Sequence, residues 1–82
     1  MIPTIGQSLI YRTNAAERAS WATSLTECPA LCLISHGDGD ATMVVFYSSP
    51  DAGGEEVARQ RVHRANEDAP PGVSEGTWSQ AY

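Results

Sequence analysis

The chain has 82 residues, of which 41% are hydrophobic, and these suffice for one domain with one core. Ten acidic residues face five arginines and no lysine, which gives a formal net charge of −5. Sequence-independent binding of nucleic acid needs many Lys and Arg contacts to phosphates, so this composition argues against nucleic acid as a partner. An acidic surface instead suits a basic protein partner, or serves solubility alone.

Two stretches of the chain bear on membrane insertion. The first residues, Met1–Thr4, lack the charged region and the long apolar run of a signal peptide. Met43–Tyr47, the most apolar stretch, is far too short to cross a bilayer. We therefore expect an intracellular protein that makes no membrane contact.

The N-terminal part predicts a strand followed by a short helix. In an expected strand at Gln7–Arg12, Leu9 and Tyr11 would point to one face, and Ser8, Ile10 and Arg12 to the other. A helix is expected from Asn14 to about Leu25, because Asn14 can cap it and Glu17, three residues later, completes a capping box. We expect this helix to pack on the sheet through Trp21 and Leu25; a loop is the alternative.

The next expected strand, Cys28–Ser35, is apolar on both faces. One face would carry Cys28, Ala30, Cys32 and Ile34, and the other Leu31 and Leu33. A strand of this kind is usually covered on both sides, so we expect a covering layer on each face.

The spacing of the two cysteines decides their chemistry. On a strand, Cys28 and Cys32 would have Cα atoms about 13 Å apart, beyond the roughly 7 Å limit for a disulfide. On a helix they would approach each other, but Pro29 and the β-rich surroundings argue against a helix. Two thiols are also too few for a zinc site, which needs about four ligands. We expect buried, reduced thiols and no metal or cofactor.

The second half of the chain predicts a hairpin and two further strands. His36–Asp40, with two glycines and two aspartates, is a strong turn signal, and Ala41–Ser48 is the expected partner strand. Glu55–Arg64 fits a strand or a helix, because neither period is clean. The remaining segments are a loop at 49–54, a polar connector at Ala65–Glu75 and a short final strand at Gly76–Tyr82.

These elements predict one small, mainly β domain over residues 1–82. Five short strands joined by tight turns favour an SH3-like five-stranded barrel, or a strongly bent antiparallel sheet, with one short inserted helix.

Short motifs along the chain resemble those of a group of small proteins encoded by tailed phages and prophages. The opening Pro3–Gly6, followed by Tyr11, is similar to their usual start, and Gly76–Trp78 is similar to their ending. Three internal stretches also resemble theirs: Cys28–Leu31, Val44–Phe46 and Val62–His63. Gln7 departs from the usual arginine, and residues 79–82 depart from the usual tail. The resemblance implies phage origin and a compact β fold, and it carries over no catalytic residue.

Basic side chains gather in the fourth expected strand. Arg59, Arg61 and His63 would share one strand face, and Arg64 follows them. They suit contact with phosphate or with an acidic partner surface. The alternative, which we favour, is that they offset nearby acidic residues, namely Glu55, Glu56, Glu67 and Asp68.

Aromatic residues near the end of the chain are the other candidate partner contacts. Trp is enriched at binding hot spots, so Trp78 is a candidate. In so small a domain, however, we favour the core for both Trp78 and Trp21. Tyr82 is harder to bury and is the better interface candidate. His36, Asp38 and Asp40 crowd one turn, but calcium needs six or more oxygen ligands, so we expect solvated turn residues.

The sequence favours binding over catalysis. It has no nucleophile-elbow pattern and no glycine-rich phosphate loop, and so short a chain leaves little wall for a pocket. The leading hypothesis is a non-enzymatic protein-interaction module of phage origin that acts on a host protein in the host-cell cytoplasm. The alternative is a structural virion component, such as a capsid decoration or head–tail accessory protein. A small enzyme, or its regulatory subunit, is a third hypothesis.

Overall fold

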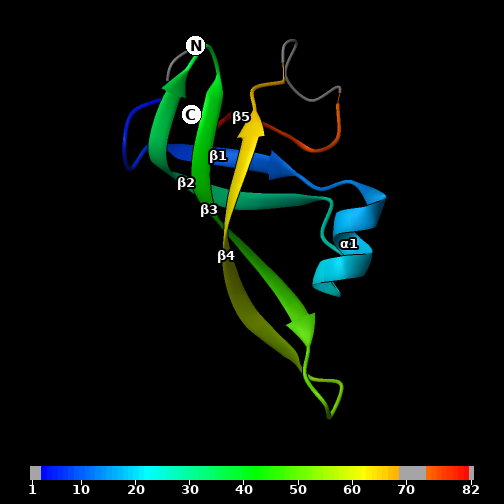
Figure 1. Ribbon diagram of the computed structural model, residues 1–82. Coiled ribbons are helices and arrows are strands. Elements are labelled where there is room, and N and C mark those ends of the chain that lie inside the picture. Colours follow the sequence, from blue (N-terminus) through cyan, green and yellow to red (C-terminus); the bar gives the residue numbers. More distant parts are fainter. Residues whose placement is uncertain (1–2, 69–73, 82) are drawn as a thin grey trace.

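Five antiparallel strands in one sheet and one short helix make up the computed structural model, which describes residues 3–68 and 74–81 (Figure 1). The elements are β1 (Ser8–Arg12), α1 (Ala15–Trp21), β2 (Glu27–Gly37), β3 (Asp40–Pro50), β4 (Glu56–Asn66) and β5 (Thr77–Gln80). Their order across the sheet is β4-β3-β2-β1-β5. The predicted mainly β fold with one short inserted helix is confirmed.

Helix α1 begins as the sequence predicts and ends earlier. The Asn14 side chain accepts a hydrogen bond from the Glu17 N–H at 2.8 Å, and Glu17 accepts one from the Asn14 N–H at 3.0 Å, which completes the capping box. The helix ends at Trp21, where Ala22 adopts the left-handed conformation. The prediction that the helix reaches Leu25 is therefore wrong. Leu25 lies beyond the helix and is exposed, so Trp21 alone of that predicted pair packs on the sheet.

The β2–β3 hairpin forms where the turn signal predicted it. Asp38 and Gly39 at its tip both have positive φ, the conformation that two-residue hairpin turns require. Register shifts between Cys32 and Ile34, and again near the turn, mark bulges in β2. A bulge bends its strand and changes which face the next side chain occupies. Ile34 is half exposed instead of lying beside Cys32, so its predicted position is wrong.

The core lies on one face of the sheet, which we call the inner face. It consists of Leu9, Tyr11, Trp21, Cys28, Ala30, Cys32, Ala41, Met43, Val45, Ala65 and Trp78. On the opposite, outer face, Leu31 is 37% exposed and Leu33 is 41% exposed. The expectation that the Cys28–Ser35 strand is covered on both sides is therefore wrong, because within the described residues only the inner face of β2 has a covering layer.

The two edge strands meet near Trp78. An isolated parallel bridge joins Glu67 to Trp78, and the Asp68 N–H donates to the Trp78 carbonyl at 2.8 Å. The Trp78 indole Nε1 donates to the carbonyl of Gly39 at 2.9 Å and to that of Ala65 at 3.2 Å. Along the described residues, β4 and β5 have no continuous ladder between them and remain the two ends of the strand order. The sheet is therefore not a closed barrel, as expected for a strongly bent sheet.

The β3–β4 hairpin extends well beyond the rest of the sheet (Figure 1). Its register runs without interruption from the Asp40–Asn66 pair to the Pro50–Glu56 pair. The choice between strand and helix for Glu55–Arg64 is thus settled as a strand, which extends into the expected polar connector. Residues 69–73 of that connector lie outside the described residues.

Candidate functional site

The basic side chains of β4 contact neighbours other than those predicted. Arg59 donates through Nε to Ser49 Oγ at 3.1 Å. Arg61 places its guanidinium 4.7 Å from the Trp21 ring centre, a cation–π contact. Each of the two side chains is thus held by a contact within the domain. The sequence predicted that the basic side chains of this strand offset the charge of nearby acidic residues. This prediction is wrong for Arg59 and Arg61, which contact Ser49 and Trp21 instead.

Arg64 lies on the outer face and is paired with Asp40. Its Nη2 lies 2.7 Å from Asp40 Oδ2 and its Nε lies 3.1 Å from Oδ1, a bidentate contact. The hydrogen bond from Arg64 lowers the pKa of the partly exposed Asp40 carboxyl. This pair therefore balances charge at one end of the outer face.

His63 points inward and joins β4 to the helix. Its Nε2 lies 2.9 Å from the Tyr11 hydroxyl and 3.0 Å from Glu17 Oε2. The Tyr11 hydroxyl also donates to Glu17. Burial, and then the hydrogen bond to Glu17, raise the pKa of Tyr11 far above its ordinary range.

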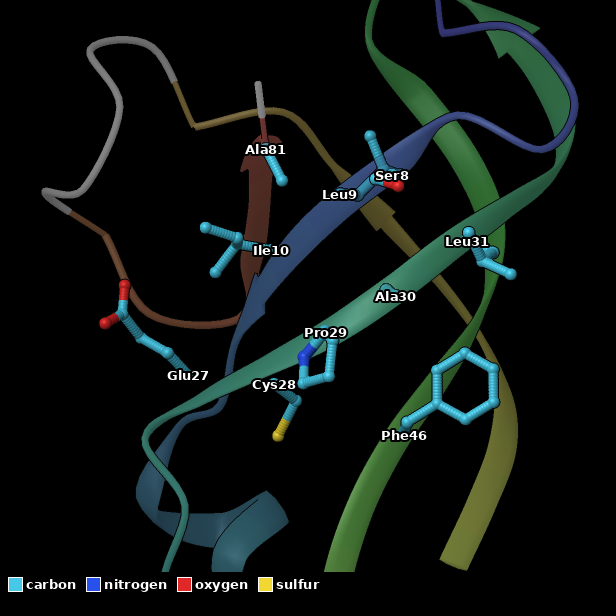
Figure 2. Close-up of a pocket in the computed structure, with 10 residues that line it drawn as sticks. All are labelled: Ser8, Leu9, Ile10, Glu27, Cys28, Pro29, Ala30, Leu31, Phe46 and Ala81. Carbon is cyan, nitrogen blue, oxygen red and sulfur yellow. The ribbon is translucent and has the colours of Figure 1, made fainter.

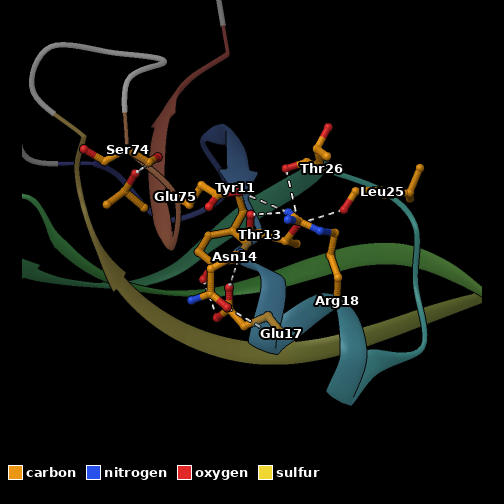
Figure 3. Close-up of polar contacts among 10 residues, drawn as sticks. Tyr11, Thr13, Asn14, Glu17, Arg18, Leu25, Thr26, Ser74 and Glu75 are labelled. Atoms are coloured by element: carbon orange, nitrogen blue, oxygen red, sulfur yellow. Dashed lines mark hydrogen bonds and ion pairs between the residues drawn. The ribbon is translucent and has the colours of Figure 1, made fainter.

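This three-residue cluster of Tyr11, Glu17 and His63 holds three elements together. Tyr11 has no exposed surface, and its raised pKa keeps the phenol protonated at neutral pH. The Glu17 carboxylate accepts hydrogen bonds from the Tyr11 hydroxyl and the Asn14 N–H, and it also contacts His63 Nε2. Figure 3 shows Tyr11, Asn14 and Glu17 together with the contacts of Arg18, whose Nη1 donates to the Thr13 carbonyl at 2.7 Å. The cluster therefore anchors α1 to β1 and β4.

The two cysteines are buried and unbridged, as the strand spacing predicted. Cys28 is 1% exposed and Cys32 is 0% exposed, and both are free thiols on the inner face. Burial raises the pKa of each thiol, so both stay protonated and unreactive at neutral pH.

The turn residues have local structural contacts. His36 Nε2 lies 2.8 Å from Thr42 Oγ1, and Asp40 is occupied by Arg64. Asp38 forms the turn itself with a φ of 52°. Residues 3–68 and 74–81 contain no group of three His, Cys, Asp or Glu side chains placed to hold a metal ion.

Part of the outer face of the sheet is apolar and exposed, and sequence reasoning missed it. Leu31 pairs with Val44, and Val44 pairs with Val62, which forms an apolar row across β2, β3 and β4. Val62 is 65% exposed, although it lies in the middle of its strand. Leu33 and Ile34 extend the patch along β2 and are also exposed. The signal was present in Leu31 and Leu33, but it was assigned to a second covered face.

A shallow groove adjoins this row (Figure 2). Its volume is about 500 Å³. Ile10, Pro29, Leu31 and Phe46 supply its apolar wall, with Glu27 at its margin. Glu27 is paired with Arg12 across the β1–β2 ladder. We call the groove and the Leu31–Val44–Val62 row together the outer apolar surface.

Neither C-terminal aromatic residue can be assigned to a binding surface. Trp78 is completely buried, so it belongs to the core, and its candidacy as a partner contact is wrong. Tyr82 lies outside the described residues. Of the candidate contacts predicted from sequence, Arg59, Arg61 and Arg64 are exposed, whereas His63 is partly buried.

Comparisons with protein-family models, with curated proteins and with solved structures find no match to this chain. Among the described residues, no helix has the length and apolar character needed to span a bilayer.

Proposed function

We propose that this protein is a non-enzymatic interaction module that binds a basic protein through the outer apolar surface. The observation that carries the proposal is the apolar row of Leu31, Val44 and Val62, in which Leu31 and Val62 are exposed and Val44 is partly exposed. This row lies on the face of the sheet opposite the core. Contiguous exposed apolar side chains on a small domain are typical of binding surfaces. Phage origin, which the resemblance of the short motifs suggests, is part of the proposal. So is a host protein as partner, which the acidic, lysine-free composition favours.

Charge supports a partner that is apolar at the contact and basic around it. The two arginines of the outer face are each paired with a carboxylate, Arg12 with Glu27 and Arg64 with Asp40. The outer apolar surface is therefore nearly neutral, whereas the whole chain has a formal net charge of −5. Such a charge steers a basic partner toward the molecule and opposes the approach of a second copy.

Photo-crosslinking in the host cell identifies the partner. A photoreactive amino acid replaces Val62 on the outer apolar surface, and in a control protein it replaces Asp51 at the β3–β4 turn. The proposal expects a protein that is captured from Val62 and not from Asp51. Capture only from Asp51, or equally from both positions, contradicts it.

Binding is then measured with the purified partner and a matched pair of leucine variants. Leu31 is 37% exposed on the outer face, and Leu25 is 36% exposed in the α1–β2 loop. Leu31→Ser should weaken binding about tenfold, because an apolar contact worth about 1–2 kcal/mol is lost. Leu25→Ser should leave affinity unchanged. Equal effects of the two substitutions would refute the proposed surface.

The alternative, a structural virion component, gives a different crosslink. Copies assembled on a virion would crosslink to each other through Val62, and mass spectrometry of purified virions would detect the chain. A Val62 crosslink to a second copy would therefore replace the host-partner proposal with the virion one.

A further inference from the structure

Strand β4 is an open edge of the sheet. It lies first in the strand order and pairs with β3 along one side from Glu56 to Asn66. On its other side, the contacts that the described residues provide are confined to one end of the strand. They are the bridge from Glu67 to Trp78 and the hydrogen bond from the Trp78 indole to the Ala65 carbonyl. Most of β4 is exposed, so this edge is accessible to another chain.

The hydrogen bonds at both ends of the β3–β4 ladder determine which β4 groups face outward. At the turn, the Asp51 N–H donates to the Glu55 carbonyl, and at the other end the Glu67 N–H donates to the Gly39 carbonyl. Hydrogen-bonded and non-hydrogen-bonded pairs alternate along an antiparallel ladder. The odd-numbered β4 residues therefore bond to β3. The peptide groups of Ala58, Gln60 and Val62 face the open edge.

Two arginines flank these outward peptide groups without a carboxylate partner in the described part of the chain. Arg59 is held by Ser49, and Arg61 is held over the rings of Trp21 and Tyr47. Both side chains lie on the inner side of the strand and are exposed. The rings and the hydroxyl restrict these side chains, so little rotamer entropy remains to be lost when a carboxylate binds.

A second copy of β4 fits this edge poorly. In an antiparallel pair, the outward even-numbered residues must oppose one another, so Arg59 and Arg61 must oppose odd-numbered residues. Registers that overlap most of the strand place Arg59 or Arg61 opposite the same residue, opposite each other or opposite His63. Like charges directly opposite one another destabilise a sheet.

We propose that the β4 edge binds an extended acidic segment of another protein as an added antiparallel strand. The segment exchanges backbone hydrogen bonds with Ala58, Gln60 and Val62. Two acidic side chains, separated by one residue, lie opposite Arg61 and Arg59, at the closely spaced non-hydrogen-bonded positions. An apolar side chain before the first acid lies opposite Val62. The acceptor is the strand edge. This proposal shares Val62 with the outer apolar surface, but it does not involve Leu31 on β2.

The probe is a short N-acetylated, C-amidated peptide that contains the sequence valine-glutamate-threonine-glutamate between threonines. Its control carries lysine in place of both glutamates. Backbone amide NMR shifts should localise the acidic peptide to residues 58–62, and its affinity should fall as salt rises. The lysine peptide should not bind. Equal binding of the two peptides, or no binding of the acidic one, overturns the proposal.

Two pairs of variants test the geometry. Gln60→Pro removes an outward N–H that β3 does not use, whereas Gln60→Ala keeps it; only the proline variant should lose binding. Arg59→Gln should weaken binding about two- to fivefold, as expected for one cross-strand charge pair, and Arg64→Gln, on the other face, should change it less. If Gln60→Pro fails to fold, the comparison of Arg59→Gln with Arg64→Gln tests the proposed strand addition.

Two outcomes separate this proposal from that for the outer apolar surface. Leu31→Ser should leave peptide affinity unchanged, because its side chain lies on β2, two strands from the edge. Loss of peptide binding in Leu31→Ser would assign the peptide to the outer apolar surface and overturn strand addition. A dimer formed without peptide and broken by Gln60→Pro would also overturn it, because a second copy would then occupy the edge.

Discussion

The rings of His63 and Tyr11 meet edge to face, with 4.8 Å between their centres and 2.9 Å between His63 Nε2 and the Tyr11 hydroxyl. The two residues are 52 positions apart in the chain. Their contact joins β4 to β1 at the point where Glu17 also brings in α1. One buried phenol therefore connects three elements, and its titration is linked to folding.

Raising the pH should destabilise the protein through this phenol. The pKa of Tyr11 is raised in the folded state from its ordinary value of 10.0. A raised pKa gives stability that is complete below pH 10 and is lost as the pH rises beyond it. Tyr11→Phe should therefore flatten the decline of unfolding free energy above pH 10, measured by urea titration between pH 7 and 11.

The same variant gives a control at neutral pH. Tyr11→Phe should cost about 1–2 kcal/mol at pH 7, because Glu17 and His63 lose a buried hydrogen-bond partner but keep each other. Cys28 and Cys32 also have raised pKa values, from 9.0, so some decline should begin near pH 9 in both proteins. Parallel curves above pH 10 would show that Tyr11 ionises freely in the folded protein.

The left-handed conformation of Ala22 predicts a stabilising substitution. Its φ of 54° at the end of α1 is unfavourable for alanine and ordinary for glycine. Ala22→Gly should stabilise the protein by about 0.5–1 kcal/mol. Ala19→Gly, inside the same helix, should instead destabilise it by about 0.5–1 kcal/mol. Urea denaturation of the two variants measures both signs, and destabilisation by Ala22→Gly would contradict the assigned helix end.

Local signals predicted the elements whose structure depends on neighbouring residues. The capping box of Asn14 and Glu17 gave the start of α1, and the Asp38–Gly39 turn gave the central hairpin. The end of α1 was missed because the left-handed residue is an alanine and not a glycine. A sequence pattern records conformational preference, and Ala22 adopts this conformation against its preference.

The outer apolar surface and the contacts of β4 depend on packing between distant segments. Leu31 and Leu33 show that the outer face of β2 is apolar. Whether another layer covers this face depends on distant segments of the chain, and the sequence of β2 does not show where those segments pack. The sequence predicted that Arg61 pairs with a nearby acidic residue. Its actual contact is with Trp21, which lies 40 positions earlier in the chain. Such contacts leave no local periodicity, so sequence reasoning assigned the wrong neighbours.

Two glycines with nearly equal φ separate backbone strain from crowding. Gly39 has a φ of +83°, and a Cβ there would lie 3.0 Å from the Glu67 Cβ. Gly54 has a φ of +84°, and a Cβ there would meet no atom within 4 Å. Gly54→Ala should cost about 1 kcal/mol from strain alone. Gly39→Ala should cost about 1 kcal/mol more, because the hairpin tip must also move away from Glu67.

Chemical denaturation of both alanine variants tests this difference. Their m-values should match that of the wild-type protein, so that the change lies in stability and not in the denatured state. If both variants lose the same stability, the added methyl at residue 39 is not crowded by Glu67, and backbone strain accounts for the whole cost at both positions.

Replacing Trp78 should weaken the junction between β4 and β5. Its indole Nε1 donates to the Gly39 carbonyl, and its ring is completely buried. Trp78→Phe removes that hydrogen bond and part of the core volume, which should cost about 2–4 kcal/mol. Trp21 is also buried, but its ring packs against Tyr11 and Tyr47, and an aromatic replacement keeps those contacts.

The matched variant Trp21→Phe should therefore be the milder of the two. Thermal unfolding followed by circular dichroism should show a larger fall in Tm for Trp78→Phe, since each kcal/mol corresponds to about 4–8 °C in a domain of this size. Hydrogen exchange in Trp78→Phe should also accelerate first at Asp68, whose N–H donates to the Trp78 carbonyl, because the strand end is released before the core. If Trp21→Phe melts lower, the helix contacts stabilise the sheet more than the β4–β5 bridge does, and the bend of the sheet does not depend on Trp78.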